Sequence, residues 1–237
     1  MTSPGRCHTG DMRRRLVALG GVVLLTGTFK LLLHALWFRP RMKTWGATQE
    51  EVAETYPGDG LLPDADSSTT MATTLPAPPE RVWPWLVQMG FDRAGWYSWD
   101  RLDRGGTPSA RRIVPEWQHL EEGQRLAATP DGETWFDVAL VEPGRTLVLR
   151  SDIDVVEGHS RESQAGPLPR VYLNGTWGFH LRPTEDGGTR LVVRTRGKGR
   201  PRRLLRPFDF LVGEPAHFIM QTRQFHGLRQ RVGAESG

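Results

Sequence analysis

Three residues in the sequence have the types and spacing that proton transfer requires. Glu214 and His217 stand three positions apart in "GEPAHF", on neighbouring positions of one helical face. Histidine titrates near neutral pH and is the side chain that most often serves as a general acid or base. Asp100 is a second candidate acid, because burial in a cavity would raise its pKa. A structural role is the alternative: Glu214 and His217 would hold a helix against a sheet, and Asp100 would cap a helix or brace an arginine.

A dense group of aromatic residues indicates a different chemistry, the binding of an apolar molecule. Residues 81–100 hold four of the nine tryptophans of the chain. A buried aromatic side chain covers about 150–250 Å², and four of them exceed what a thin core of sheet and helix needs. We expect this stretch to pack the core and its second half to reach a ligand. The predicted lining residues are Trp96, Tyr97, Trp99, Trp177, Phe179 and Phe218.

Several kinds of active site are excluded by missing motifs. The sequence has no glycine-rich phosphate loop, no H-E-x-x-H zinc motif and no G-x-S-x-G nucleophile turn. Its single cysteine, Cys7, rules out a disulfide framework and a cysteine-based metal site. We therefore expect neither a metal nor a cofactor.

The net charge of +4 is unevenly spread, because all charged residues from 187 to 208 are basic. This basic run fits a solvated strand with its connection, or a surface for anionic lipid head groups or nucleic acid. Nucleic acid is the weakest of these interpretations and none is expected as a partner, because no aromatic residues are interleaved with the arginines.

The periodicity predicts the elements that position these residues. An apolar face indicates a helix from Pro79 to Gly90, which Pro84 must bend unless the helix starts later. A second short helix follows within 96–103. Alternating apolar and polar residues predict strands within 69–77, 135–141, 145–151, 171–183 and 189–196. These strands form an antiparallel meander with one buried and one wet face, and His180 falls on the wet face.

A long helix is predicted at the C-terminus, from Glu214 to about residue 233, where apolar residues recur at helical spacing. The order of elements predicts an α+β fold in which a curved antiparallel sheet wraps around this helix, the helix-grip arrangement. Sheet and helix would leave a gap that aromatic side chains line.

The first 66 residues are predicted to precede this domain, which we assign to residues 67–234. Residues 1–15 form a basic tail, and residues 16–38 form a hydrophobic helix about 34 Å long, enough for a single-pass membrane anchor. Lys30 and His34 interrupt the helix, so a cleaved signal peptide, an interfacial helix and a buried helix stay open. Residues 39–66 are predicted to be a linker with a short helix, capped by Thr48 with Glu51.

Four stretches of the chain carry a family resemblance. They are "WGATQEEVAETYPGDGLLPD", "APPERVWPWLVQMGFDRAGWYSWDRL", "RIVPEWQHLEEGQRL" and "EPAHFIMQTRQFHGLRQR". They resemble the START-like helix-grip superfamily, also called SRPBCC, and its uncharacterised bacterial branch labelled polyketide cyclase/dehydrase and lipid-transport-like. The resemblance covers about residues 44–234. It implies a cavity for a hydrophobic small molecule or lipid, without metal or nucleotide, and does not separate carriers from enzymes.

Together these features predict a membrane-tethered protein that binds an apolar small molecule or lipid in an aromatic-lined cavity. The alternative is a cyclase or dehydratase that acts on a polyketide-like substrate, with His217 and Glu214 or Asp100 moving protons. The ligand and the bilayer, through residues 16–38, are the expected partners.

Overall fold

The computed structural model of the chain describes residues 30, 32–162 and 167–234. The chain forms two compact units, residues 1–41 and 42–237. The predicted basic tail, 1–15, and most of the predicted anchor, 16–38, lie outside the described residues. In the first unit a π-helix spans His34–Phe38, and α2 (Arg39–Lys43) continues into the second unit, so that Lys43 belongs to the second unit. Within the described residues, no helix has the length and apolar character needed to cross a membrane.

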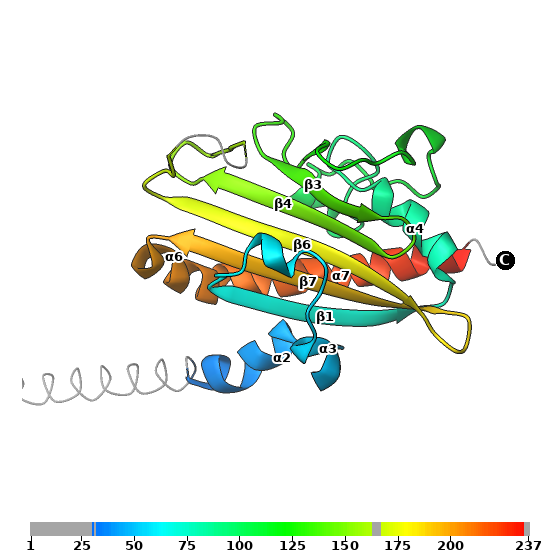
Figure 1. The fold of residues 1–237 in the computed structure, drawn as a ribbon, viewed down its shortest axis with the longest axis horizontal. Coiled ribbons are helices and arrows are strands. Elements are labelled where there is room, and N and C mark those ends of the chain that lie inside the picture. The colour runs from blue at the N-terminus through cyan, green and yellow to red at the C-terminus, as the bar shows by residue number, and fades with distance from the viewer. Residues whose placement is uncertain (1–29, 31, 163–166, 235–237) are drawn as a thin grey trace, which may run out of the picture. The chain divides into compact units, whose positions relative to one another are not determined.

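A seven-stranded antiparallel sheet is the centre of the second unit (Figure 1). Its strands are β1 (Ser67–Leu75), β2 (Arg125–Ala127), β3 (Trp135–Glu142), β4 (Thr146–Asp154), β5 (His159–Ser160), β6 (Tyr172–Pro183) and β7 (Thr189–Arg200). They lie in the order β1-β7-β6-β4-β3-β2, with β5 paired to β4. The predicted antiparallel meander is confirmed.

The two longest helices of the second unit, α4 (Pro79–Val87) and α7 (Glu214–Ala234), lie on one face of this sheet, and Figure 1 shows α7 crossing behind the strands. The helices after β1 are α4 (Pro79–Val87), α5 (Asp100–Asp103), the 3₁₀ helix η3 (Pro115–Trp117), α6 (Arg202–Phe208), the π-helix η4 (Asp209–Gly213) and α7 (Glu214–Ala234). Helix α4 begins at Pro79 and contains Pro84, so of the two predicted starts of this helix the earlier one is confirmed. The predicted C-terminal helix is confirmed, and the chain has the predicted α+β helix-grip arrangement.

The packed core lies between the inner face of the sheet, which faces α7, and helices α4 and α7. One row of residues across four strands is almost completely buried: Met71, Val193, Phe179 and Leu147. Helix α7 and the segment before α5 lie very close together at Gly227. A methyl group placed there would lie 2.2 Å from the carbonyl oxygen of Tyr97. Glycine at this position therefore lets the helix pack against the core.

The outer face of the sheet is covered, which corrects the prediction of a wet face. Residues 44–66 cover it and include α3 (Gln49–Ala53) and the 3₁₀ helix η2 (Asp59–Leu61). In Figure 1 the cyan part of this segment, which contains η2, lies in front of the strands, and α3 lies next to β1. The predicted capping box of Thr48 and Glu51 is confirmed. His180 is only 4% exposed and lies against Tyr56, with 4.7 Å between ring centroids. Burial lowers the pKa of His180 to about 4.

Ion pairs fasten residues 44–66 to β7. Arg190 binds Glu51 at 2.7 Å, and Arg194 binds Asp59 at 3.2 Å. Further along the strand, Lys198 pairs with Asp64, and Arg200 with Asp66. The strand part of the basic run is therefore neither a solvated surface nor a free surface for anions, because carboxylates of the preceding segment already bind its side chains.

Candidate functional site

The inner face of the sheet changes character along the strands. Next to the fully buried row lies a mixed row, in which Thr69 and Leu149 are buried and Thr195 and Trp177 are partly exposed. The following row consists of small residues only: Ser67, Gly197, Gly175 and Ser151. All four are partly exposed, and we call them the small-residue row. The inner face is thus tightly packed at the fully buried row and poor in side-chain volume at the small-residue row.

Open space lies over the small-residue row at Gly197. A methyl group placed on this residue would meet no other heavy atom within 4 Å. On Gly175 the nearest atom would be the Oγ of Ser151, at 3.3 Å. Neither glycine has the left-handed backbone that would demand a glycine. The missing side-chain volume therefore follows from the residue types and not from a turn.

An aromatic cluster borders this open space. Trp177 contacts Phe179 at 4.8 Å, Trp96 at 5.5 Å and Phe136 at 5.8 Å between ring centroids. Phe179 and Trp96 are buried, whereas Trp177 and Phe136 are partly exposed. Three of the predicted lining residues thus come together here. Phe136 was not predicted, although its place in the alternating pattern of 135–141 puts it on the same face.

Two buried glutamines of α7 connect the helix to the aromatic cluster. Trp177 Nε1 donates to Gln221 Oε1 at 3.1 Å, Gln221 Nε2 donates to Gln224 Oε1 at 2.8 Å, and Gln224 Nε2 donates to the carbonyl oxygen of Trp96 at 3.0 Å. A buried amide is costly unless it is hydrogen-bonded. This chain therefore fixes the ring of Trp177. Neither glutamine was predicted. Their signal in the sequence is two uncharged polar residues three positions apart on the inward side of a helix.

The predicted pair of Glu214 and His217 lies in the first turn of α7. The Glu214 carboxylate accepts a hydrogen bond from Lys43 Nζ at 3.1 Å and lies 3.4 Å from Ser67 Oγ. Burial and the charge of Lys43 lower the pKa of His217 to about 4, so this ring is neutral at pH 7. Its Nε2 is buried and has no hydrogen-bond partner among the residues described. The arrangement therefore offers one neutral hydrogen-bonding nitrogen beside an ion pair.

His217 lies four residues before Gln221, on the same helical face that meets the aromatic cluster. Ser67, which contacts Glu214, belongs to the small-residue row. The polar groups of the first turn of α7 thus stand at the β1 end of that row. Lys43 was not predicted, because it lies in a segment that the sequence pattern assigns to a linker.

The predicted acid Asp100 lies on another element, at the start of α5. Ser109 Oγ donates to its carboxylate at 2.5 Å. Asp103, one turn later, has two buried oxygens without a partner in the described part of the chain. Burial and the neighbouring charge of Asp100 raise the pKa of Asp103 to about 6. Asp103 was not predicted, since nothing in the sequence around it signals burial.

The remaining predicted residues lie at other places around α7. Tyr97 is buried, and its hydroxyl donates to the carbonyl oxygen of Trp85 at 3.0 Å. Trp99 is 46% exposed, and the guanidinium of Arg223 lies 5.1 Å from its ring centroid.

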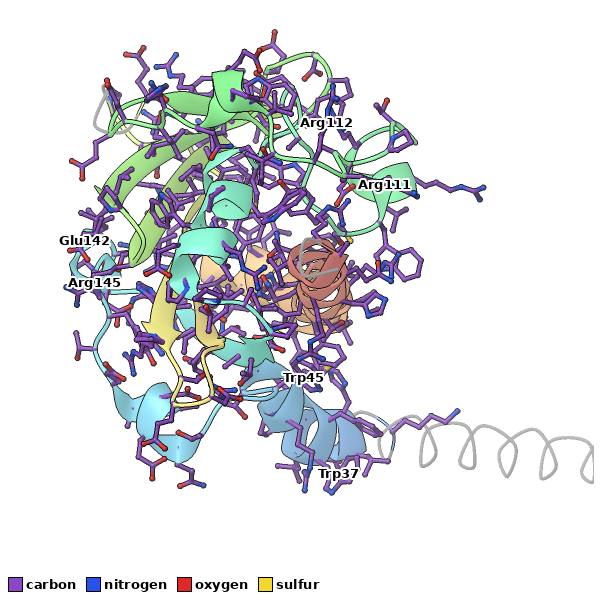
Figure 2. The ribbon with its side chains drawn as sticks, turned by 90° about the vertical axis from the view of Figure 1, so that its right-hand side faces the viewer. Trp37, Trp45, Arg111, Arg112, Glu142 and Arg145 are labelled. Atoms are coloured by element: carbon purple, nitrogen blue, oxygen red, sulfur yellow. The ribbon has the colours of Figure 1, made fainter. Side chains whose placement is uncertain are left out.

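Phe218 is partly buried and packs edge-on against Trp45, with 6.5 Å between centroids. Trp45, labelled in Figure 2, also stacks on Phe225 of α7 at 6.0 Å. Phe218 thus faces the segment before α3, while Trp177 and Phe179 stand on the sheet.

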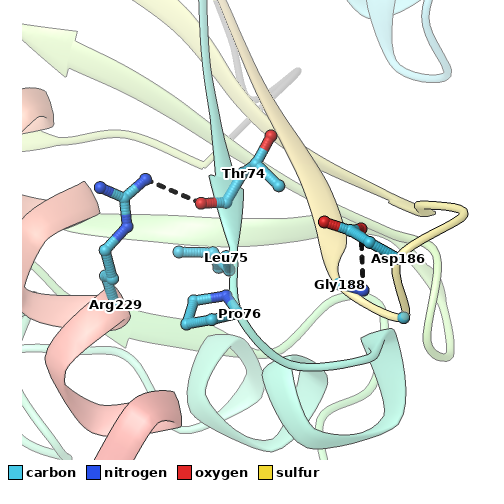
Figure 3. Close-up of a pocket in the computed structure, with 7 residues that line it drawn as sticks. Thr74, Leu75, Pro76, Asp186, Gly188 and Arg229 are labelled. Carbon is cyan, nitrogen blue, oxygen red and sulfur yellow. Dashed lines mark hydrogen bonds between the residues drawn. The ribbon is translucent and has the colours of Figure 1, made fainter.

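A pocket of about 470 Å³ lies elsewhere, at the turn between β6 and β7 (Figure 3). Its lining residues are Thr74, Leu75, Pro76, Asp186, Gly187, Gly188 and Arg229. Arg229 donates to the carbonyl oxygen of Thr74 at 2.7 Å, and Asp186 accepts from the Gly188 amide at 3.4 Å. Because its charged groups already bind the protein, we place the candidate site at the small-residue row. In the described ranges, no three metal-binding side chains of the His, Cys, Asp or Glu type gather.

Comparisons with known proteins give distant structural likenesses. No protein-family profile matches the chain, and no curated protein sequence matches it either. Protein MLL2253 from Mesorhizobium loti is 19% identical over 71% of this chain and 98% of its own, with a TM-score of 0.41. Hypothetical protein jhp0584 from Helicobacter pylori is 11% identical over 74% and 94%, with a TM-score of 0.43. Ara h 8.0201 is 14% identical over 68% and 97%, with a TM-score of 0.36. Likenesses this distant do not bear on function.

Proposed function

We propose that this protein binds an apolar small molecule or lipid over the small-residue row. The observation that carries the proposal is the open space at Gly197, which lies beside the partly exposed ring of Trp177. Binding sites for small molecules are concave, mostly apolar and furnished with few polar groups. The small-residue row, the aromatic cluster and the first half of α7 have this composition.

The ligand gains affinity by leaving water. Each methylene group that is removed from water contributes about 0.8 kcal/mol. The ring of Trp177 is already held by Gln221, so little conformational entropy is lost when a ligand packs against it. The free Nε2 of His217 supplies a single neutral hydrogen-bonding group, suited to orienting a hydroxyl or carbonyl group.

Two further parts of the proposal, the role as a carrier and the membrane tether, rest on the sequence. The resemblance to the START-like superfamily supports a carrier or a polyketide-type enzyme, and the apolar residues 16–38 support a membrane tether. We favour a carrier, because Lys43 already binds the carboxylate of Glu214 that the enzyme mechanism would pair with His217.

The test is a fluorescence titration with N-phenyl-1-naphthylamine, a neutral apolar probe whose emission rises in apolar sites. Gly197→Leu fills the open space with four carbon atoms and should weaken binding at least about tenfold, which is 1.4 kcal/mol. Gly60→Leu is the matched control, since Gly60 is exposed, lies on the outer-face segment and also has no atom within 4 Å of an added methyl group.

Wild type and Gly60→Leu should bind the probe equally well. Equal binding by Gly197→Leu would mean that the probe lies elsewhere, and the proposed site would then be wrong.

A further inference from the structure

An apolar stripe lies exposed on the helical segment that follows β7. Along α6 and η4 its first three members recur at steps of four and three residues, Val212 follows the third directly, and Ile219 stands about two turns later on α7. This spacing places them on one side of the helical segment. They are Leu204 (59% exposed), Phe208 (62%), Leu211 (55%), Val212 (48%) and Ile219 (51%). Scattered exposed apolar residues are normal, but a contiguous stripe of large ones marks an interaction surface.

Helix α6, which carries the first members of the stripe, packs against the sheet through Leu205. A methyl group on Gly199 of β7 would lie 2.9 Å from Leu205 Cδ1 and 3.0 Å from Leu173 Cδ2, so α6 packs closely on the sheet there. Leu204 and Phe208, in contrast to Leu205, are mostly exposed to solvent. The exposure of the stripe therefore follows from packing and not from a frayed end.

Basic residues flank this stripe. Arg202, Arg203 and Arg206 lie on α6, and each is exposed. Arg202 binds Asp66 at 3.1 Å, whereas no carboxylate in the described part of the chain pairs with Arg203 or Arg206. The basic residues of β7, in contrast, are bound by carboxylates of residues 44–66. Within the basic run of residues 187–208, the charge that remains available thus lies beside the apolar stripe.

We propose that the stripe and its arginines form a docking surface for an anionic lipid bilayer. A helix that lies in the membrane interface inserts an apolar face and places Lys or Arg at the level of the head groups. Each basic residue near an anionic surface adds about 1 kcal/mol of attraction. A second copy of the chain is a poorer occupant, because a two-fold contact joins the same patch of both copies and would bring Arg203 and Arg206 of both into one interface.

The test is a local probe in the full chain, so that insertion by other segments does not confuse it. In a Cys7→Ser background, Leu211→Cys carries the environment-sensitive fluorophore NBD. With vesicles of phosphatidylcholine and phosphatidylglycerol, the NBD emission should move to shorter wavelength and rise severalfold. Vesicles of phosphatidylcholine alone should give little change. The control position is Val156→Cys, which is 73% exposed in the turn after β4 and should report no change with either vesicle.

The role of charge is tested in the same assay. Replacing Arg203 and Arg206 by Gln should weaken the apparent vesicle affinity by about fivefold for each arginine removed. The matched control replaces Arg111 and Arg112, two exposed arginines of the loop before η3 that Figure 2 labels, and should leave the affinity unchanged.

Three results would overturn the proposal. They are an unchanged NBD signal with anionic vesicles, an equal response at Val156→Cys, and a concentration-dependent blue shift without vesicles, which would identify a second copy as the occupant. None of these results depends on a ligand over the small-residue row, so the docking surface can be refuted without refuting the proposed function, and the reverse is also true.

Discussion

The two faces of the sheet are closed in different ways. On the outer face, carboxylates of residues 44–66 bind the basic side chains of β7, and His180 is buried against Tyr56. On the inner face, the residues beside α7 form a fully buried row, whereas open space is left at Gly197 in the small-residue row. The outer face, whose basic side chains are already paired, needs no further binding partner. A face closed only in part has room for another molecule, and this difference locates the proposed function.

The packed half of the inner face should tolerate the least change. Gly227→Ala places a methyl group 2.2 Å from the carbonyl oxygen of Tyr97, which neither backbone can avoid without moving. We expect a loss of about 3 kcal/mol in the free energy of unfolding, measured by urea denaturation. Gly233→Ala is the control in the same helix, where an added methyl group meets nothing within 4 Å. It should gain up to about 1 kcal/mol from helix propensity, and equal stabilities would refute the tight contact.

The outer face should make stability depend on pH through His180. Its folded pKa of about 4 lies below the ordinary value of 6.5. As the pH falls from 6.5 to 4, the unfolded chain binds a proton that the folded chain does not, so stability is lost across this window. His180→Phe should remove about 2–3 kcal/mol of that loss, measured by urea denaturation at pH 7 and pH 4.

The control for this pH dependence is His226→Phe, at an exposed position of α7. It should keep the wild-type loss of stability between pH 7 and pH 4. If His180→Phe keeps it as well, burial of His180 does not contribute to the pH dependence.

The ion pairs of the outer face should differ in strength according to burial. Arg190 binds both oxygens of Glu51 at 2.7 Å, and these side chains are 23% and 11% exposed. Arg190→Met should cost about 2 kcal/mol, because it leaves a partly buried carboxylate without its partner. Arg182→Met removes the pair with Glu54, whose side chains are 43% and 40% exposed, and should cost about 0.5 kcal/mol. Equal losses in thermal or urea unfolding would show that burial does not set the value of these pairs.

The open half of the inner face should give the smallest change in stability. Gly197→Leu places a side chain where an added methyl group meets no atom within 4 Å. Leucine is a better strand residue than glycine, so the free energy of unfolding should stay within about 0.5 kcal/mol of wild type. A loss like that of Gly227→Ala would show that the space is closed.

The sequence predicts the inner face better than the outer face, for a physical reason. Apolar residues at alternate positions, such as Val193 and Phe179, carry their own signal because they must be buried. Arg190 and Arg194 signal a wet face unless their partners are known, and those partners stand 139 and 135 positions earlier. The acidic residues follow one another in the same order as the basic residues that they bind. That shared order is a signal that single-strand periodicity cannot use.

Only part of the candidate site could be predicted, and the reason is again that periodicity reports on one segment at a time. Trp177 and Phe179 follow from alternation within β6, and Trp96 from the aromatic density of residues 81–100. The small-residue row is not visible along the chain, because its members belong to four strands and meet only through cross-strand pairing.

The most direct test of the central claim is ¹⁹F NMR of protein labelled with 5-fluorotryptophan, with resonances assigned by single Trp→Phe variants. Addition of N-phenyl-1-naphthylamine should shift the resonance of Trp177, which borders the open space. It should leave Trp135 unchanged, since that ring lies under Arg125 on the other face of the sheet. The Trp177 shift should disappear in Gly197→Leu. A Trp177 resonance that stays in place while the probe binds would contradict a ligand site over the small-residue row.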